Sequence, residues 1–253
     1  MAMDADIGVV ITSHNYGRYL EACLDSVLTQ TVKPKDVVVI DDNSDDDTED
    51  VVRRFECVRY FRVNFKNGNR ARNFGFKQIA CQYVTFFDAD NLMMPTFLAQ
   101  LHQALINDET AAFAYSDRIN FADSNAEWYP HSMGHVCVGA FDKDRLMTSN
   151  YIDLSALIRR AWFQGFDEGL RRYQDWDLWL NIVIKQSGYG CYVPEPLFRY
   201  RAHGNNLSRT EDRDLAMWSI RRKYRLGWGK LPFLRHSYWA YSLVCRLKRR
   251  LGG

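Results

Sequence analysis

The 253-residue sequence contains no apolar run that approaches the roughly 18 residues needed to cross a membrane. Its first ten residues, MAMDADIGVV, contain neither the basic segment nor the apolar stretch of an export signal. The six cysteines include no CxxC pair and fall mostly within apolar patterns, which is typical of reduced core thiols rather than a disulfide framework. Together these absences predict a cytoplasmic protein.

Two common nucleotide-binding motifs are also absent. No GxGxxG follows the first apolar run, and no GxxxxGK followed by Ser or Thr occurs anywhere, so neither a dinucleotide-binding fold nor a P-loop is indicated. The content of 47% hydrophobic and 25% charged residues is ordinary for a globular protein. The length suits one large α/β domain, with or without a small appendage.

Strand-like and helix-like segments alternate through the first hundred residues. The first helical segment places its apolar residues at the 3.6-residue spacing of one helix face. The strand-like runs are IGVVIT (7–12), DVVVIDD (36–42), VRYFRV (58–63) and YVTFF (83–87). This alternation predicts an α/β fold with a mostly parallel central sheet and helices on both faces.

Polar residues follow three of these strands at the point where each strand ends. They are Thr12 and Ser13 after the first strand, Asp41 and Asp42 after the second, and Asp88 and Asp90 after the fourth. Because ligands bind at the carboxyl ends of parallel strands, these side chains predict one shared site.

Two carboxylates beside an apolar strand repel each other and lose hydration, so the Asp88-Ala89-Asp90 pair needs a cation, a hydrogen-bond network or protonation. Mg²⁺ or Mn²⁺ would satisfy both carboxylates and would also bind the oxygens of a phosphate. The pair therefore suits a nucleoside diphosphate site. Taken alone, the tripeptide is also compatible with a helix-capping turn.

Two neighbouring segments add further candidates for this site. Asp42 can accept a hydrogen bond from a base or a ribose, whereas the acids at 45–47 are typical of a solvated capping turn. Arg70 and Arg72 lie at the turn into a helix, where backbone N–H groups favour anions. The alternative for Arg72 is a charge on the helix surface.

The second half of the chain contributes an acidic and a basic segment. Asp175 and Asp177 begin an amphipathic helix, where acids are also favoured by the helix dipole alone. The neighbouring tryptophans would raise the pKa of such an acid and make it a better proton acceptor. Arg199, Arg201 and His203 alternate along a probable strand, an arrangement that suits a pyrophosphate.

A possible soft-metal site lies between these regions. His131 and His135 are four residues apart in HSMGHVC, and Cys137 is close by. Gly134 disfavours a helix there, and no HExxH motif is present, so the spacing alone does not establish a zinc site.

Six blocks of the sequence resemble, in order, those of family 2 glycosyltransferases of the GT-A fold, over roughly residues 6–208. They are VVITSHNYGRYLEACLDSVLTQT, DVVVIDDNSDDDT, GNRARNFGF, FFDADN, QDWDLWL and YRAHGNNLS. The resemblance implies an inverting transfer of a sugar from a nucleoside diphosphate donor, most simply UDP-linked, to an acceptor hydroxyl, with Mn²⁺ or Mg²⁺. It also implies a GT-A domain over 1–210, with a nucleotide-binding half at about 6–106 and an acceptor half at about 107–210.

The resemblance also implies roles for single residues. Asp175 resembles the general base, Arg72 resembles the residue that reaches the nucleotide base, and Asp90 is the more direct of the metal ligands. The expected donor contacts are Thr12, Ser13, Asp41, Asp42, Arg72, Asp88 and Arg201, and the expected metal ligands are Asp88, Asp90 and His203.

Three features depart from the family pattern. Gln174 precedes the general base where the family often has Glu, and Asn181 stands where many members have Arg. The segment 118–150, where the acceptor is expected, matches no block of the family. The implied acceptor is a saccharide or a lipid-linked saccharide of surface polysaccharide synthesis.

The charge of the chain is unevenly distributed. The net charge is +2, but residues 216–253 contain ten Lys or Arg and no acid, which leaves a net charge of −8 for the first 215 residues. We expect residues 211–253 to form a basic, aromatic, helical tail that contacts an anionic membrane surface from the cytoplasm. The alternative is a helix that packs on the domain and exposes a basic face.

Two other function classes share features with this sequence. A nucleotidyltransferase acting on sugar phosphates also uses metal held by acids, but it would normally have a Gly-rich loop where this chain has TSHNYGRYL. A nucleic-acid-binding module would use the basic tail, but the tail lies outside the segments that carry the expected site. We expect no nucleic-acid partner.

Overall fold

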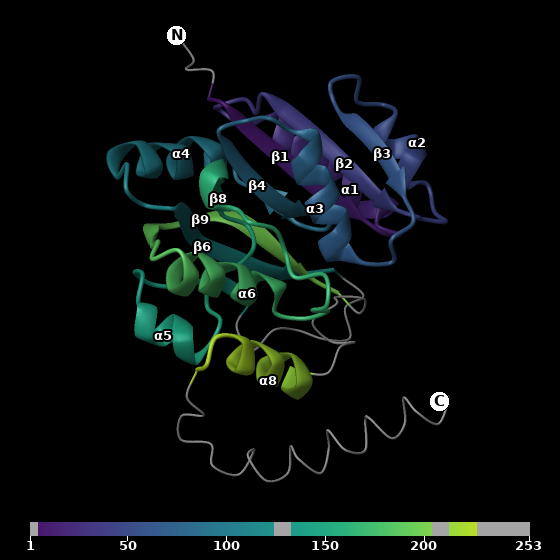
Figure 1. Ribbon diagram of the computed structural model, residues 1–253. Coiled ribbons are helices and arrows are strands. Elements are labelled where there is room, and N and C mark those ends of the chain that lie inside the picture. Colours follow the sequence, from purple (N-terminus) through teal and green to yellow (C-terminus); the bar gives the residue numbers. More distant parts are fainter. Residues whose placement is uncertain (1–4, 124–132, 204–212, 227–253) are drawn as a thin grey trace, which may run out of the picture.

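A single mixed sheet forms the centre of the protein, as a computed structural model of residues 5–123, 133–203 and 213–226 shows (Figure 1). In spatial order its strands are β3 (Arg59–Val63), β2 (Asp36–Asp42), β1 (Ile7–Ser13), β4 (Tyr83–Asp88), β8 (Leu157–Arg159), β6 (Phe113–Ala122), β9 (Gly190–Ala202) and β5 (Leu92–Met93). The short strand β7 (Gly134–Val136) pairs with β6 outside this path.

The first four strands of the sheet are parallel, and β6 and β9 are parallel to each other. β8 runs antiparallel to both β4 and β6 and so joins the two parallel groups. The predicted α/β fold with a mostly parallel sheet is therefore confirmed. The parallel strands of the first half bring their carboxyl ends to one edge, which positions the site described below.

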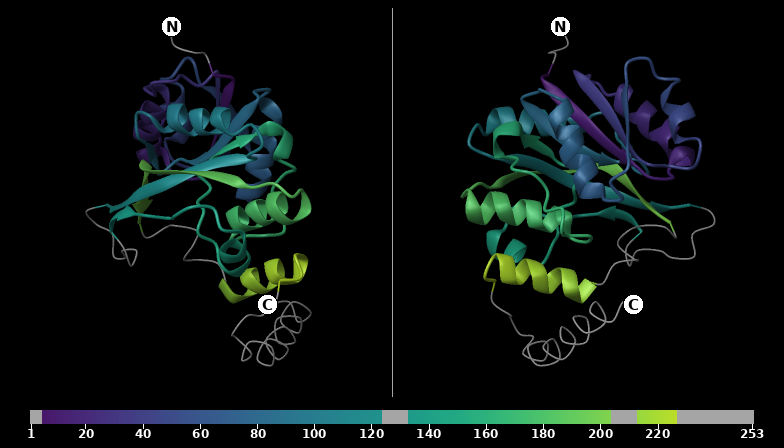
Figure 2. Two further views of the ribbon diagram at one scale, coloured as in Figure 1. Left: turned by 90° about the vertical axis from the view of Figure 1, so that its left-hand side faces the viewer. Right: turned by 45° about the vertical axis from the view of Figure 1, so that its right-hand side comes forward.

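Helices cover both faces of the sheet (Figures 1 and 2). They are α1 (Gly17–Leu28), α2 (Thr48–Val52), α3 (Gly68–Gln78), α4 (Phe97–Asn107), α5 (Lys143–Thr148), α6 (Gln174–Leu180) and α8 (Arg213–Lys223). Within the described residues, none of these helices is long and apolar enough to cross a bilayer.

Alternate residues of the buried strands supply two hydrophobic cores, one on each face of the sheet. Val10 and Ile40 pack in the core that includes α3 and α6, whereas Val9 and Val39 pack in the core that includes α1 and α4. On the first face, α3 approaches the sheet at Gly75, where an added Cβ would lie 2.5 Å from the Val10 side chain. Only glycine permits this close approach.

The helix that carries Asp175 is shorter than the sequence pattern suggests. The apolar spacing predicts one helix from Asp175 to Gly188. In the structure the α-helix α6 ends at Leu180, and a π-helical turn, Asn181–Lys185, follows it directly. The Asn181 side chain is used within this turn, where its Oδ1 accepts a hydrogen bond of 2.9 Å from Gln186. Simple 3.6-residue periodicity does not distinguish an α-helix from a helix with a wider final turn.

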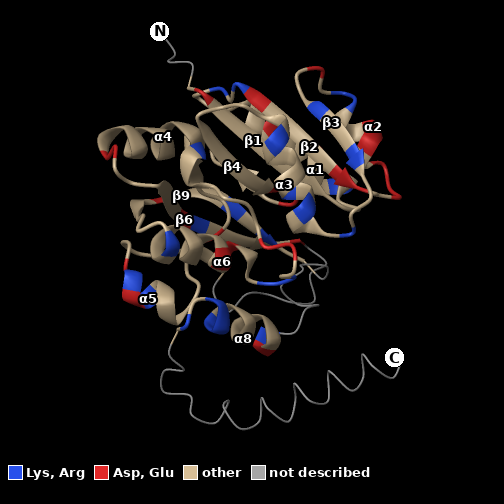
Figure 3. Ribbon diagram, in the orientation of Figure 1, with Lys and Arg blue, Asp and Glu red and all other residues tan. Residues whose placement is uncertain are grey.

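Helix α8 packs against α6 at the end of the molecule away from the N-terminus (Figure 2). Its basic last turn (Figure 3) is not wholly solvated: Arg221 donates to the Thr148 carbonyl and Lys223 pairs with Asp177. Ile220 is fully buried. For residues 213–226 the packing alternative for the tail therefore holds, while residues 227–253 lie outside the described part.

Candidate donor and catalytic site

A cavity of about 670 Å³ opens at the carboxyl ends of β1, β2 and β4. Its walls come from the strand ends, from the loop before α3 and from the segment that leads into α6. A volume of this size suits a ligand larger than a monosaccharide, such as a nucleotide sugar.

Most of the residues predicted from the sequence lie on the walls of this cavity. Those that line it are Thr12, Ser13, Asp42, Arg72, Asp88, Asp90 and Asp175. Asp41, Arg201 and His203 are not among the described lining residues. The structure thus brings the DxD segment and the predicted general base to one cavity from positions 85 residues apart in the chain.

The two carboxylates of the DxD segment have different surroundings. Arg72 lies 2.7 Å from Asp88 Oδ1, and the Asp88 side chain is 36% exposed. Asp90 is buried, and its Oδ2 lies 2.9 Å from His203 Nε2. Burial raises the pKa of Asp90, and the hydrogen bond with His203 opposes this rise. The charge repulsion expected from the sequence is therefore offset in part by Arg72 and His203.

Arg201 and His203 act behind Asp90 rather than in the cavity wall. Arg201 Nε donates to the Asp90 carbonyl at 2.9 Å, and its guanidinium also pairs with Asp123. Tyr200, the residue before Arg201, lines the cavity instead. Because successive side chains of a strand point to opposite sides, Tyr200 and its two neighbours cannot all face the cavity.

Arg199, the third member of this basic segment, also does not line the cavity. Its guanidinium lies over the Phe121 ring, 4.3 Å from the centroid. Arg201 lies over the same ring, 4.5 Å from the centroid. A pyrophosphate contact shared by Arg199, Arg201 and His203 stays a prediction.

Asp41 and Asp42 have structural partners in the turn after β2. Asp41 is fully buried and accepts hydrogen bonds from Ser44 N and the Tyr60 hydroxyl. Asp42 accepts three backbone hydrogen bonds, of 2.6 to 2.9 Å, from residues 65–67. These bonds use about three of the four acceptor sites of the Asp42 carboxylate. Asp42 thus shapes the loop before α3, and its contact with a nucleoside stays a prediction.

Arg72 is held by protein groups in a similar way. Besides its contact with Asp88, its guanidinium lies 3.4 Å from Asn69 Oδ1, and its side chain is almost fully buried. A direct contact between Arg72 and a nucleotide base stays a prediction.

Asp175 is held in a fixed orientation at the start of α6. Asn150 Nδ2 donates to Oδ2 at 2.7 Å, and Trp176 N donates to Oδ1 at 2.8 Å. Loss of hydration and the nearby negative charge of Asp153 raise the pKa of Asp175 to about 6. The sequence-based expectation of a raised pKa is confirmed in direction. A second cause, the negative charge of Asp153, adds to the loss of hydration and was not part of that expectation.

Several residues of the cavity wall were not predicted from the sequence. Lys66, Arg171 and Arg172 add positive charge to the walls, and Asn150 orients Asp175. The basic pair before Asp175 is visible in RRYQDW, but Asn150 lies 25 residues upstream of its partner and carries no local signal.

The backbone is strained at several points around the cavity. Three lining residues other than glycine have positive φ angles: Asn43 at 62°, Lys66 at 50° and Tyr173 at 60°. Left-handed backbone is costly for Lys and Tyr and tends to persist where function requires a particular geometry.

The sequence and the fold both match known glycosyltransferases. The sequence model of the protein family described as Glycosyl transferase family 2 matches residues 8–166. Glycosyltransferase GlyA of Streptococcus pneumoniae is 30% identical over 228 residues, which cover 83% of this chain but only 32% of GlyA. The UDP-Glc:alpha-D-GlcNAc-diphosphoundecaprenol beta-1,3-glucosyltransferase WfaP of Escherichia coli is 26% identical over 218 residues, which cover 84% of each protein.

Among solved structures, TarS 1-349 of S. aureus in complex with UDP-GlcNAc aligns with a TM-score of 0.68 and 18% identity, covering 86% of this chain and 65% of that one. The mannosyltransferase PcManGT from Pyrobaculum calidifontis, in complex with GDP-Man and Mn²⁺, aligns with a TM-score of 0.57 and 18% identity, covering 86% and 60%. At this level of identity the likeness concerns the fold, and it confirms the predicted GT-A fold.

Proposed function

Because the chain belongs to glycosyl transferase family 2, we propose that it transfers a sugar from a nucleoside diphosphate donor to an acceptor hydroxyl, with inversion at the anomeric carbon. The observation that carries the proposal is the position of Asp175 and of the Asp88 and Asp90 carboxylates on the walls of one cavity. A base and an acidic, metal-compatible segment are the groups that such a transfer needs.

The residues present fit a divalent metal. Arg72 engages only Oδ1 of Asp88 in the salt bridge, and the Asp88 side chain remains partly exposed to the cavity. Asp90 adds a second carboxylate, and His203 orients it from behind. We propose Asp88 and Asp90 as the metal ligands, with His203 as a partner of Asp90. The chemistry that Mn²⁺ or Mg²⁺ supplies there is stabilisation of the negative charge on the departing diphosphate.

In the proposed reaction, Asp175 removes the proton of the acceptor hydroxyl as the acceptor oxygen bonds to the anomeric carbon. The bond between that carbon and the diphosphate oxygen breaks, and the nucleoside diphosphate leaves with the electron pair. Asn150 and the Trp176 backbone hold the two carboxylate oxygens of Asp175 in place. Lys66, Arg171 and Arg172 add positive charge along the donor side of the cavity.

UDP is the nucleotide that we propose for the donor. The names of two similar proteins point this way, since WfaP is named for UDP-Glc and one TarS structure contains UDP-GlcNAc. PcManGT is described with GDP-Man, so a guanine nucleotide is the main competitor. Nucleotidyl transfer is not favoured, because the family match and the aligned structures are glycosyltransferases.

Calorimetry with UDP, GDP, dTDP and CDP, with and without Mn²⁺, tests the donor site. We expect UDP to bind in the presence of Mn²⁺. Asp90→Ala should weaken this binding by at least the roughly 10- to 100-fold that loss of an outer-shell partner of a metal costs. Asp50→Ala, which removes an exposed acid from α2, is the matched control and should bind like the wild type. Nucleotide binding that depends on neither Mn²⁺ nor Asp90 would overturn the assignment.

For the two halves of the domain, we propose that residues 6–106 bind the donor and residues 107–210 bind a saccharide or lipid-linked saccharide acceptor. We propose also that the chain beyond α8 contacts an anionic membrane surface, because it is rich in Lys, Arg, Trp and Tyr. Flotation with anionic vesicles should recover the full chain but not a chain ending at Leu226, which keeps the packed helix α8. Equal recovery of both chains would contradict the membrane contact.

A further inference from the structure

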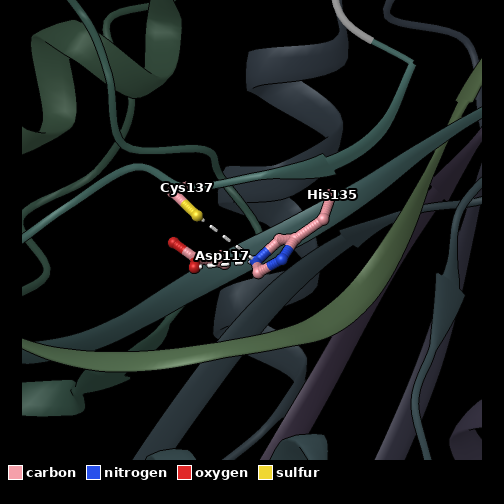
Figure 4. Close-up of side chains that lie close together, drawn as sticks. All are labelled: Asp117, His135 and Cys137. Atoms are coloured by element: carbon pink, nitrogen blue, oxygen red, sulfur yellow. Dashed lines mark hydrogen bonds and ion pairs between the residues drawn. The ribbon is translucent and has the colours of Figure 1, made fainter.

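Three potential metal ligands converge on β6 and β7, as Figure 4 shows. Asp117 lies on β6, His135 on β7, and Cys137 just after β7. Their ligand atoms all lie within 4.8 Å of one another. His135 Nε2 is 2.9 Å from Asp117 Oδ2 and 3.7 Å from Cys137 Sγ.

The strand pairing explains why these three side chains meet. β6 and β7 are antiparallel, and Arg118 is paired with Val136. Cys137 follows the end of β7 by one residue, and extending the register by one position would place it opposite Asp117. His135 is two residues before Cys137 and therefore points to the same side of the ribbon. The grouping thus follows from the register of the sheet rather than from a chance surface contact.

The contacts do not suit a catalytic Cys-His-Asp relay. In such a relay the thiol and the carboxylate contact opposite nitrogens of the imidazole, so that a proton can pass through the ring. Here the Cys137 thiol and the Asp117 carboxylate both approach Nε2. Three potential ligand atoms that cluster within 4.8 Å of one another are instead the arrangement found around a metal ion.

We propose that Asp117, His135 and Cys137 bind a transition-metal ion of the Zn²⁺ type, as the three ligands that the described residues supply. Ligands at about 2.0–2.3 Å from a tetrahedral Zn²⁺ lie roughly 3.3–3.8 Å apart, so the observed contacts need only small side-chain shifts. One thiolate, one imidazole and one carboxylate favour Zn²⁺ over Mg²⁺ or Mn²⁺, which prefer oxygen ligands.

The surroundings of Asp117 support this assignment. Its Oδ1 accepts hydrogen bonds from Val138 N at 2.8 Å and from the Tyr192 hydroxyl at 2.7 Å. These bonds fix a buried carboxylate with Oδ2 directed toward His135, as outer-shell partners do in metal sites. His135 and Cys137 are exposed, which gives an ion a path to the site.

The proposed site is separate from the donor cavity. None of its three ligands is among the described residues that line that cavity. An ion at this place would fix β7 and the segment after it onto β6, in the half of the chain proposed to bind the acceptor. The inference does not depend on sugar transfer, because its test measures metal binding alone.

Titration of the full-length, chelator-treated protein with Co²⁺ tests the site, because a cobalt–thiolate bond gives a charge-transfer absorption band that oxygen ligands do not give. We expect this band in the wild type, saturating at one equivalent, and its displacement by Zn²⁺. Cys137→Ser should abolish the band. Cys57→Ser, which removes another exposed thiol, is the matched control and should retain it.

Two further variants separate ligation from general effects on folding. His135→Ala removes an exposed ligand. It should weaken Co²⁺ binding by at least the roughly 10- to 100-fold that loss of an outer-shell partner costs. Tyr192→Phe leaves all three ligands in place and should weaken binding by about 10- to 100-fold. Absence of the band in the wild type, or a band that persists in Cys137→Ser, would overturn the proposal. An unchanged far-ultraviolet circular dichroism spectrum and thermal transition in each variant would show that the fold is intact.

Discussion

Replacing Asp175 by Asn is expected to lower the turnover number for sugar transfer by about 10²- to 10⁴-fold, the usual contribution of a positioned general base. Asn has the same shape and can still accept the hydrogen bond from Asn150, but it cannot take a proton. Binding of the donor nucleotide should change little, because the substitution leaves Asp88 and Asp90, the proposed metal ligands, in place. Steady-state kinetics and calorimetry together distinguish a lost base from a damaged donor site.

The pH profile supplies the control for this prediction. Because the pKa of Asp175 is about 6, its base form is lost as the pH falls through 6, so kcat/KM should decrease tenfold per pH unit below that value. Asp153→Asn removes a negative charge that raises this pKa and should move the acidic limb to lower pH. A limb that stays in place in Asp153→Asn would contradict the assignment of Asp175 as the base.

The sequence predicted those parts of the site that depend on strand ends. Thr12, Asp42 and Asp88 each follow an apolar run, and the carboxyl ends of parallel strands meet at one edge of the sheet. The same reasoning predicted a ligand contact for Asp41, which also lies at a strand end. Its carboxylate instead accepts hydrogen bonds from Ser44 N and the Tyr60 hydroxyl. Position along a strand predicts the edge of the sheet at which a side chain lies. It does not predict whether a neighbouring backbone group will use that side chain.

Contacts between distant segments could not be predicted in this way. Asn150 orients Asp175 from the segment after α5, and His203 supports Asp90 from a position 113 residues later. Neither contact can be inferred from hydrophobic periodicity or from the spacing of nearby residues, because each depends on how the second half of the chain crosses the sheet. The convergence of Asp117 with His135 likewise depends on the register of β6 and β7, although the sequence alone shows His135 and Cys137 close together.

Helix α8 provides the clearest example of such a long-range contact. Asp177 follows the proposed base by two residues, and its side chain is only 4% exposed. The Lys223 ammonium of α8 lies 2.8 Å from it. Burial raises the pKa of Asp177, and Lys223 opposes this rise. From the sequence alone, the helix dipole explains an acid at position 177. A buried acid also needs a specific cationic partner, which the sequence does not identify.

Lys223→Met is therefore expected to lower the free energy of unfolding by about 2–3 kcal/mol at neutral pH, below the 3–5 kcal/mol typical of a fully buried pair because Lys223 is 35% exposed. Without the ammonium, the pKa of Asp177 in the folded state should rise further above its value in the unfolded chain. The penalty is then largest above the folded-state pKa and is relieved as the pH falls toward the unfolded-state value.

Urea denaturation of a double-mutant cycle tests this prediction. In the Asp177→Asn background no charge remains to be compensated, so Lys223→Met should cost less than about 1 kcal/mol, with the difference giving the coupling energy. A similar cost in both backgrounds would show that Lys223 stabilises α8 through its apolar stem and its contact with Asp167 rather than through Asp177.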